Sequence, residues 1–387
     1  MNSCETGSHS RVPLLLEAWS VATQAVHPVE LLKNAGYRVP KQSAALFWGK
    51  AALATEAGLR GFRQSLVIFP KGQATGGKPS ENFRSVGVAR VGGDHPLPGE
   101  ASFEAGGRIL DFFDSLRRHG ISQLEVFLSG GASSLAWIKP SFISRSELDR
   151  RLARLYSLPL SIETLNHERS KLCALKNGGA LDWLMRLAPG IRVHVYVISD
   201  VLPFSMETVG SGPFRGLSHH LLSDNRKWIE ELAMACEQRG MVVRKKSSGR
   251  VSPLQDWHQD GIRWAKKTVS AEKSGIFLQG GEPLLALPIG RGRGGRQTHL
   301  AALLAHDLHS EILDGKIEIL CTSSDGLDGS SRSAGAFLTK KTLPSKHSLE
   351  KAVKHFDSAT LLKRTGALIP QIFTGTNVQD AMTLRVV

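Results

Sequence analysis

Apolar and polar positions along the 387-residue chain follow two alternating periods. Short apolar runs of strand length are separated by longer segments whose apolar residues recur every three or four positions, the period of an amphipathic helix. Strands are predicted at residues 65–69, 86–91, 124–128, 193–198, 239–246, 276–278, 284–289 and 317–321, and residues 44–48 form a short apolar run that ends in Gly49-Lys50. Helices are predicted at residues 17–35, 51–59, 102–118, 219–237 and 254–271, with a charged helical region at 145–178. The alternation favours parallel sheets in an α/β architecture.

The most informative pattern is FLQGGEPLLALPIGRGRGGRQTHL, residues 277–300. The apolar block at 284–289 predicts a buried strand, and four glycines interleaved with three arginines follow it. Leucines at helical spacing then predict the start of a helix. Glycines allow backbone N–H groups to approach a ligand, and a helix N-terminus attracts anions. The stretch therefore predicts a phosphate-binding loop.

Small and acidic residues collect after the predicted strands. In parallel sheets ligands bind beyond the carboxyl ends of the strands, so these positions are candidates for a site. They are Ser129 to Ser133, Asp200, Glu282, Gly290 to Arg296 and Asp325 to Gly329. The composition becomes basic and polar near residues 240–274, where we predict a domain boundary.

Composition narrows the class of protein. The chain is 41% hydrophobic and 22% charged, which is typical of a globular protein large enough for two domains. Its four cysteines lie far apart with no CxxC spacing, which argues against a disulfide framework or a zinc site. We find no signal peptide and no apolar run long enough to cross a bilayer. These features predict a cytoplasmic protein with no membrane partner.

The net charge of +14 does not by itself indicate nucleic-acid binding. The densest basic patch, residues 239–250, has no interleaved aromatic residues and no zinc-finger or helix-turn-helix pattern. A solvated basic segment is the better interpretation, and we expect no nucleic-acid partner.

Two formal motif matches are weak. Residues 72–78 match the start of a P-loop, but Pro79 replaces the serine or threonine that would bind magnesium. Gly290, Gly292 and Gly295 satisfy GxGxxG, yet no second strand ends in an acidic residue about twenty positions later.

Other positions each have a functional and an ordinary interpretation. Ser129 to Ser134 is an anion-binding turn or a simple strand–helix turn, and Asp200 is a magnesium ligand or a helix cap. Asp325 and Asp328 share a turn too short for an EF-hand. Lys50 is a solvated lysine or, if it faces a cleft, a charge that assists phosphoryl transfer.

Taken in order, these motifs resemble the glycerate 2-kinase family with a MOFRL C-terminal domain. The resemblance covers nearly the whole chain. It is carried by WGKAA (48–52), DHPLPGEAS (94–102), LSGGASSL (128–135), RSKLCALKNGG (169–179), ISDV (198–201), VGSGP (209–213), GGE (280–282), GRGRGGR (290–296), SDGLDG (324–329), AGA (334–336) and TGTNVQD (374–380).

The resemblance implies a kinase that uses ATP and Mg²⁺ to convert D-glycerate to 2-phosphoglycerate. It implies two α/β domains, each a largely parallel sheet flanked by helices, with the active site in the cleft between them. The expected domains are 13–240, Rossmann-like, and 274–387, the MOFRL domain, with 241–273 as a connecting basic and helical segment.

The resemblance also implies roles for individual residues. The catalytic residues would be Lys50 and Arg296, and the metal ligands would be Asp200 and Glu282. Phosphate or glycerate would be bound by Ser129, Gly130, Gly131, Ser133, Gly212, Gly294, Gly295, Asp325 and Asn377.

The chain departs from the family pattern at three places. Leu202, Pro203 and Phe204 replace a usual Gly-Asp, His299 replaces a usual glutamate, and Lys171-Leu172-Cys173 replaces a usual HLS. Two alternatives stay open, the first because of the GxGxxG match at Gly290, Gly292 and Gly295 and the second because acidic groups are lost. One is an NAD(P)-dependent oxidoreductase that acts on hydroxypyruvate or a related hydroxyacid, and the other is a catalytically impaired relative.

Overall fold

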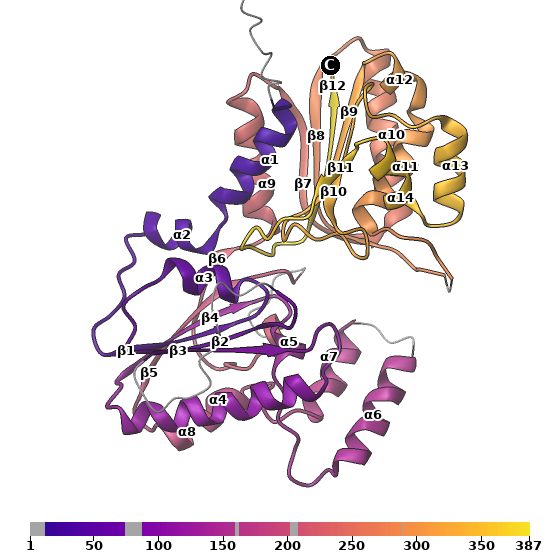
Figure 1. Cartoon of the computed structure of the whole chain (residues 1–387). Coiled ribbons are helices and arrows are strands. Elements are labelled where there is room, and N and C mark those ends of the chain that lie inside the picture. The colour runs from indigo at the N-terminus through magenta and orange to yellow at the C-terminus, as the bar shows by residue number, and fades with distance from the viewer. Residues whose placement is uncertain (1–11, 74–86, 159–161, 202–207, 289) are drawn as a thin grey trace, which may run out of the picture. The chain divides into compact units, whose positions relative to one another are not determined.

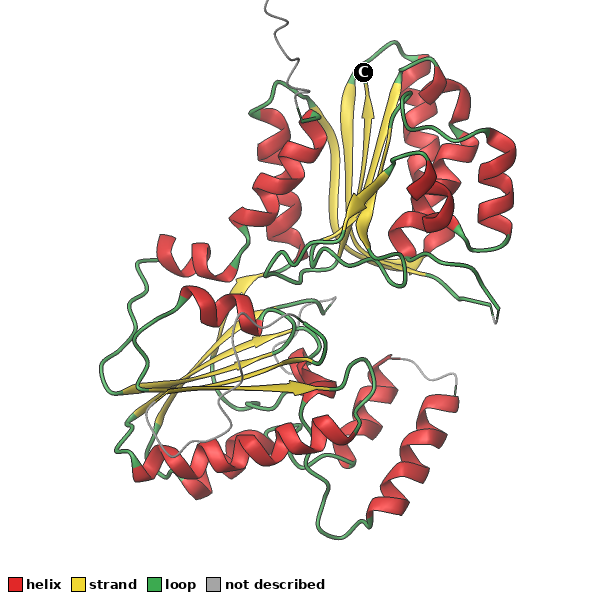
Figure 2. Cartoon of the chain, viewed as in Figure 1, coloured by secondary structure: helices red, strands yellow, loops and turns green. Residues whose placement is uncertain are grey.

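The computed structural model describes residues 12–73, 87–158, 162–201, 208–288 and 290–387. The chain divides into two compact units. The sheet A domain contains Val26–Asn225 and Phe373–Gln379, and the sheet B domain contains the chain up to Ala25, Arg226–Ile372 and Asp380–Val387. Each sheet is covered by helices, so the α/β class with two domains is confirmed (Figures 1 and 2).

Sheet A is wholly parallel, with the strand order β3-β2-β1-β4-β5-β6. Helices α4 and α8 cover one face, and α2 and α3 lie on the other (Figure 1). The strands are β1 (Ser43–Trp48), β2 (Gln64–Pro70), β3 (Gly87–Gly93), β4 (Gln123–Ser129), β5 (Arg192–Ile198) and β6 (His219–Ser223). The helices are α2 (Pro28–Asn34), α3 (Ala52–Gly58), α4 (Glu100–Arg118), α5 (Ala132–Leu135), α6 (Arg145–Ser157), α7 (Ile162–Lys171), α8 (Gly179–Leu187) and the short 3₁₀ helix η1 (Val209–Ser211).

Sheet B has the order β11-β10-β9-β12-β8-β7. Helices α10 and α11 pack on one face and α1 and α9 lie on the other (Figure 1). The strands are β7 (Val243–Pro253), β8 (Gly275–Leu284), β9 (Ile317–Ser323), β10 (Ser333–Leu338), β11 (Leu368–Pro370) and β12 (Asp380–Val386). The helices are α1 (Leu14–Ala25), α9 (Asn225–Glu237), α10 (Leu254–Ser270), α11 (Arg296–Asp307), α12 (His309–Leu313), α13 (Lys346–Lys354) and α14 (Ser358–Arg364).

Sheet B is mixed, unlike sheet A. Strands β7, β8, β9 and β11 run in one direction, and β10 and β12 run in the other. The C-terminal strand β12 lies between β8 and β9 and is antiparallel to both. The expected parallel direction therefore holds for four of these six strands, but only β7 and β8 form a parallel pair.

The predicted strand at residues 284–289 is wrong. Strand β8 ends at Leu284, which is 49% exposed, and Leu287 is 45% exposed in the loop that follows. Strand β12 begins with Asp380 opposite Gly281, so residues beyond Leu284 have no partner strand on that side. An apolar run without a partner strand does not form a sheet. Residue 289 lies outside the described residues.

Two predicted helices are also corrected. The helix expected at residues 17–35 is divided into α1 and α2, because Pro28 begins a new helix behind the N-cap residue His27. The first part of the helix expected at 219–237 is strand β6, which pairs only with β5 at the edge of sheet A. An edge strand with a largely exposed face shows little alternation of apolar and polar residues. Residues 219–223 therefore do not differ clearly in pattern from the helix that follows them.

The predicted connecting segment, residues 241–273, forms strand β7 and helix α10 of the sheet B domain. Helix α9, expected in the N-terminal domain, has all but its first residue in that same unit. The chain passes between the two units at three further places as well as near residue 225, including the short return of Phe373–Gln379. The domain boundaries predicted from the sequence, at residues 240 and 274, remain a proposal.

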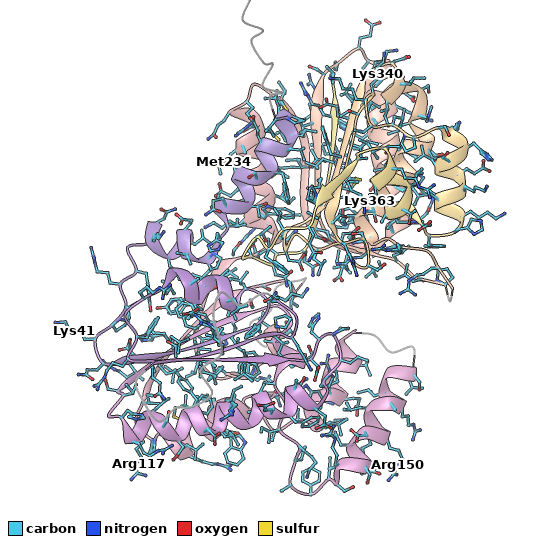
Figure 3. All side chains as sticks on the ribbon, viewed as in Figure 1. Lys41, Arg117, Arg150, Met234, Lys340 and Lys363 are labelled. Atoms are coloured by element: carbon cyan, nitrogen blue, oxygen red, sulfur yellow. The ribbon has the colours of Figure 1, made fainter. Side chains whose placement is uncertain are left out.

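Positive charge is spread over many elements. The basic side chains labelled in Figure 3 include Arg117 at the end of α4, Arg150 on α6 and Lys363 on α14. The three cysteines in the described part of the chain, Cys173, Cys236 and Cys321, are buried and unpaired. Among the described residues, no helix is long and apolar enough to cross a membrane.

Candidate functional site

The strand order of sheet A creates a switch point between β1 and β4. From β1 the chain proceeds to β2 and β3 on one side, whereas β4 leads to β5 and β6 on the other. Loops leave such a sheet in opposite directions at this point and open a crevice at the carboxyl ends of the strands. Strand β1 ends just before Gly49 and Lys50, and β4 ends with Ser129 just before Gly130.

The segments that follow β1 and end β4 are joined by hydrogen bonds. The Lys50 amide donates to the Gly130 carbonyl oxygen at 2.9 Å, and the Ala51 amide donates to Ser129 Oγ at 3.0 Å. Gly49 has a φ of 134°, and a Cβ there would lie 2.2 Å from Ser129 Oγ. Only glycine allows this approach. The sequence thus places Lys50 directly at the switch point.

Asp200 and Asn377 also meet Gly130. Asp200 follows β5, and its Oδ2 accepts a hydrogen bond from Asn377 Nδ2 at 2.9 Å. A Cβ on Gly130 would lie 1.9 Å from Asp200 Oδ2 and 2.2 Å from Asn377 Nδ2. Asn377 comes from the short return segment, whose backbone is held by Asn225 Nδ2 on the Val378 carbonyl oxygen at 2.9 Å. Candidates far apart in sequence are therefore neighbours.

His95 belongs to this site although residue reasoning did not select it. A Cβ on Gly131 would lie 3.1 Å from Lys50 Cγ and 3.2 Å from His95 Cδ2. His95 lies in the DHPLPGEAS segment, which is held at the start of α4 by Asp94 Oδ2 accepting from the Ala101 amide at 2.9 Å. The quoted motif contained the signal, but a single histidine in a loop gave no reason to choose it.

A second group of polar residues surrounds Ser133 in the short helix α5. Lys176 Nζ donates to Ser133 Oγ at 2.9 Å, and the hydroxyls of Ser133 and Ser211 are 2.7 Å apart. Arg169 Nη2 donates to the Ser133 carbonyl oxygen at 3.3 Å. We call Ser133, Arg169, Lys176 and Ser211 the Lys176 cluster. Neither basic residue was singled out from the sequence, because only their motif was recognised.

Gly212 lies beside the Lys176 cluster. Its carbonyl oxygen accepts from the Gly178 amide at 2.7 Å, while its own amide donates to Val209 at 2.9 Å. This predicted binding residue therefore joins the segment after α7 to η1. Its amide is already used inside the fold.

In the sheet B domain, Arg296 is the centre of a network of carboxylates. Its Nη1 is 2.5 Å from Glu282 Oε1, and its Nη2 is 3.0 Å from Asp380 Oδ2. The pKa of Arg296 is raised, mainly by the charge of Asp380 and further by that of Glu282. Asp380 is 1% exposed, and burial raises its pKa to about 6 although Arg296 opposes that shift. Asp380 was part of a quoted motif but not a predicted site residue.

The arginine–glycine loop differs from the predicted phosphate cradle. The Gly294 amide donates to Ser330 Oγ at 3.2 Å and the Gly295 amide to Thr298 Oγ1 at 2.9 Å. At the start of α11, both Gln297 and Thr298 amides donate to the Asp328 carboxylate at 2.9 Å. The protein's own carboxylate thus occupies the helix N-terminus. The loop can offer arginine side chains to a ligand, but not these amides.

Asp325 lies near the Arg296 network, since its charge contributes to the raised pKa of Asp380, whereas His299 packs against an aromatic ring. Asp325 Oδ1 accepts from the Leu327 amide at 3.0 Å, which stabilises its own turn. His299 is 5% exposed and stacks on Phe356 with ring centroids 4.6 Å apart. Burial lowers the pKa of His299 to about 4, with a further contribution from His258. This departure from the family pattern is a packed, neutral side chain.

A cationic pocket of about 460 Å³ lies in the sheet B domain. It is at the same end of the strands as Asp380, the partner of Arg296. It is formed by Ser333 at the start of β10, Pro370 at the end of β11 and residues of α14. Four basic side chains and no acidic ones line it, namely Arg293, Arg332, Lys363 and Arg364. The charge favours an anionic ligand.

The two predicted metal ligands are not brought together within either domain, because Asp200 is in the sheet A domain and Glu282 is in the sheet B domain. In the described part of the chain, no group of three or more His, Cys, Asp or Glu side chains is arranged to hold a metal ion. Magnesium commonly takes only one or two protein carboxylates and completes its shell with water and phosphate oxygens. Asp200 fits that requirement, whereas Glu282 is already paired with Arg296.

Comparison with known families agrees with this arrangement. Residues 14–239 match the model described as Domain of unknown function (DUF4147), and residues 275–380 match the MOFRL family. The first match alone covers more than half of the chain. The chain belongs to the DUF4147 family and carries a MOFRL region. The resemblance recognised in the sequence is confirmed.

Curated relatives of this DUF4147–MOFRL protein are named as kinases. The D-glycerate 2-kinase of Thermotoga maritima is 26% identical over 86% of this chain and 87% of its own. The glycerate 2-kinases of Sulfurisphaera tokodaii and Pyrococcus horikoshii are 24% and 23% identical, and the matches cover 84% and 78% of each pair of chains.

Solved structures share the fold of this DUF4147–MOFRL protein. The crystal structure of glycerate kinase from Thermotoga maritima has a TM-score of 0.77 and is 23% identical, covering 97% of this chain and 99% of that one. A Pyrococcus horikoshii protein has a TM-score of 0.72 at 18% identity, with coverage of 97% and 98%. At these identities the likeness concerns the fold.

Proposed function

We propose that this protein is a kinase that transfers the γ-phosphoryl group of ATP to D-glycerate and forms 2-phosphoglycerate. The observation that carries the proposal is the position of Lys50 at the switch point of sheet A, next to Gly131, with Asp200 and Asn377 against Gly130. The names of the curated relatives support the substrate class and the reaction type.

The reaction is a direct displacement. The bond between the γ-phosphorus and the β–γ bridging oxygen breaks, and a bond forms between that phosphorus and the 2-hydroxyl oxygen of glycerate. The hydroxyl proton is released to water, and ADP leaves. Because the transition state is loose and its charge lies on phosphoryl oxygens, the protein mainly positions reactants and neutralises charge. We assign that neutralisation to Lys50 and Arg296.

The proposed role of Arg296 rests on how it is held. Two carboxylates, Glu282 and Asp380, fix its guanidinium in one orientation and keep it charged. A preorganised cation need not reorient during the reaction, which is the main source of electrostatic catalysis. The nearby cationic pocket supports binding of an anionic donor to the sheet B domain.

The proposed Mg²⁺ would be held by Asp200 together with phosphate oxygens. It would neutralise negative charge on the transferring group. The carboxylate is oriented for such a role by Asn377. We propose that Glu282, first predicted as a second ligand, instead orients Arg296.

The oxidoreductase alternative is not favoured. The turn after β1, where a dinucleotide fold has its glycine fingerprint, reads Gly49-Lys50 in this chain. The GxGxxG match lies in the other domain, six residues after the end of β8, and its last glycine donates its amide to Thr298. Of the family departures that motivated the impaired-relative alternative, residues 202–204 lie outside the described residues.

The decisive experiment measures ADP release with ATP, Mg²⁺ and D-glycerate, and identifies the product by NMR. We expect glycerate-dependent ADP release and phosphate on the 2-hydroxyl. Phosphate on the 3-hydroxyl would correct the product, and oxidation of NADH by hydroxypyruvate without ADP release would replace the proposal by the oxidoreductase. Tight nucleotide binding without turnover would support a catalytically impaired relative.

A further inference from the structure

Lys176 is a buried cation with no acidic partner. Its side chain is 5% exposed, and its amine contacts Ser133 Oγ at 2.9 Å and the face of Trp137 at 4.3 Å from the ring centroid. Among the described residues, no carboxylate lies within ion-pair distance of it. A buried charge is costly unless an opposite charge accompanies it, so the amine either loses its proton or is matched by an anion from outside the chain.

The groups around Lys176 do not relieve this cost. Burial is the main cause that lowers the pKa of Lys176, and the positive charge of Arg169 lowers it further. The Cys173 thiol acts weakly in the opposite direction. Arg169 is itself 9% exposed and lies with its guanidinium 6.0 Å from the Trp137 centroid. Two cations thus share one aromatic wall.

The Lys176 cluster adjoins the switch-point site. Ser133, which accepts a hydrogen bond from Lys176, is two residues beyond Gly131, where a Cβ would lie 3.1 Å from Lys50 Cγ and 3.2 Å from His95 Cδ2. Ser133 is only partly buried, so the cluster reaches the surface at its hydroxyl. Helix α5 has four residues and contributes little dipole of its own, so side-chain charge must supply the attraction for an anion here.

We propose that Lys176 and Arg169 bind the carboxylate of the acceptor, and that this pair selects an acid over a neutral polyol. The proposal deepens the proposed function, because it names the part of glycerate that the sheet A domain recognises. Carboxylate binding brings a negative charge to Lys176, so the bound state favours the protonated amine. Binding is therefore coupled to proton uptake wherever the free amine is neutral.

The test uses the full-length protein and equilibrium binding of D-glycerate, which needs no turnover. Calorimetry in two buffers of different ionisation enthalpy measures protons taken up, over a pH series that spans neutrality. We expect uptake by the wild type and a loss of affinity of at least about tenfold in Lys176→Met. The matched control is Lys171→Met, because Lys171 is an exposed lysine paired with Glu168 at 2.6 Å.

A second measurement separates charge recognition from folding. Glyceramide replaces the carboxylate by a neutral amide, so the preference of the wild type for glycerate should shrink at least about tenfold in Lys176→Met. The affinity for ATP should stay unchanged, and a parallel loss of ATP affinity would indicate donor phosphate as the anion and overturn the proposal. If circular dichroism shows that Lys176→Met is unfolded, Arg169→Gln is measured in its place with the same expectations.

The outcomes distinguish this inference from the proposed function. Phosphorylation of glycerate with unchanged KM and unchanged glyceramide preference in the variants would overturn the inference and leave the function. Proton-coupled binding of D-glycerate without turnover would sustain the inference while the kinase proposal fails. Equal binding by wild type and Lys176→Met, without proton uptake at any pH, would give Lys176 a purely structural role.

Discussion

The backbone amide of Lys50 donates a hydrogen bond of 2.9 Å to the carbonyl oxygen of Gly130. This bond joins the ends of the two central strands of sheet A, β1 and β4, which are otherwise separated by 74 positions between Trp48 and Gln123 in the sequence. Both strands are fully buried, so the main chain of Lys50 is held by a rigid core. The backbone from which the Lys50 side chain starts is therefore fixed, as the proposed role of this lysine requires.

Lys50→Ala and Arg296→Ala should each lower kcat at least about a hundredfold, because each removes a cation from the proposed transition state. Steady-state kinetics with ATP and D-glycerate measure the effect. Lys71→Ala and Arg291→Ala are matched controls, since both residues are exposed, and Lys71 follows β2 while Arg291 lies in the arginine–glycine loop. Near wild-type turnover in both site variants would remove these residues from the mechanism.

The double variant adds a separate test. If Lys50 and Arg296 act as one interdependent unit, the combined loss should be much smaller than the product of the two single losses. Fully multiplicative losses would mean that the two residues contribute independently of each other.

Gly130→Ala should abolish most activity while leaving the fold largely intact. The new methyl group would lie 1.9 Å from Asp200 Oδ2, so the carboxylate or the Asn377 amide must move. The expected result is a loss of turnover and a higher Mg²⁺ requirement, measured by titrating Mg²⁺ at fixed ATP. Gly107→Ala is the control, because a Cβ there meets nothing within 4 Å in helix α4. That substitution should stabilise the protein by roughly 0.5–1 kcal/mol.

Activity should depend on pH through Asp380. Because the pKa of this buried carboxyl is raised to about 6, acidification below that value neutralises it and weakens its hold on Arg296. We expect kcat/KM to fall as pH decreases through about 6, and this limb should vanish in Asp380→Asn. Asp314→Asn, a change at an exposed residue paired with Lys316, should leave the limb in place.

The same group should change stability in the opposite direction. Its pKa is higher in the folded state than the ordinary 3.8, so the folded protein retains a proton that the unfolded chain releases. The contribution of Asp380 to stability is therefore largest at low pH and declines as pH rises from about 4 to about 6. Urea unfolding of wild type and Asp380→Asn over this range measures it, and a wild-type stability that rises relative to that of Asp380→Asn as pH increases would contradict the assignment.

His299→Glu, which introduces the residue usual in the family, should destabilise this member. The carboxylate would replace a neutral ring stacked on Phe356 in a nearly fully buried position, at a cost of about 2–3 kcal/mol. Urea unfolding measures the loss. The exposed His347 in the first turn of α13 provides the control substitution to Glu. A gain in both stability and turnover would show that His299 is a lost site residue.

Local patterns predicted much of sheet A. The four strands β2 to β5 were each located within about three residues of their bounds, because each is a short buried apolar run between turn residues. The sequence identified β1 only as a short apolar run. Strand β6 was missed because it pairs on one side only. The apolar block at residues 284–289 has the composition of a strand and was predicted as one. It does not form a strand, because β12 begins opposite Gly281 and offers no partner beyond that point.

The sequence also listed the candidate residues, as the members of motifs in a recognisable order. The sequence did not show which backbone amides in these motifs were free to donate a hydrogen bond to a ligand. The Gly294 and Gly295 amides belong to the expected anion site, yet Ser330 Oγ and Thr298 Oγ1 already accept from them. The Thr298 amide at the start of α11 likewise donates to Asp328. Whether a loop amide is free depends on what packs against it, and Asp328 lies 30 residues from Thr298.

By itself, the sequence determined the α/β class, the two-part organisation and the position of Lys50 after a glycine, between a short apolar run and a helix. Those properties follow from local periodicity and turn residues. Only the tertiary structure decided which candidates are neighbours: Asn377 reaches Asp200 across 177 positions, and Lys176 reaches Ser133 across 43. Contacts at such separations leave no pattern in the intervening chain, because they arise from the order in which strands join a sheet.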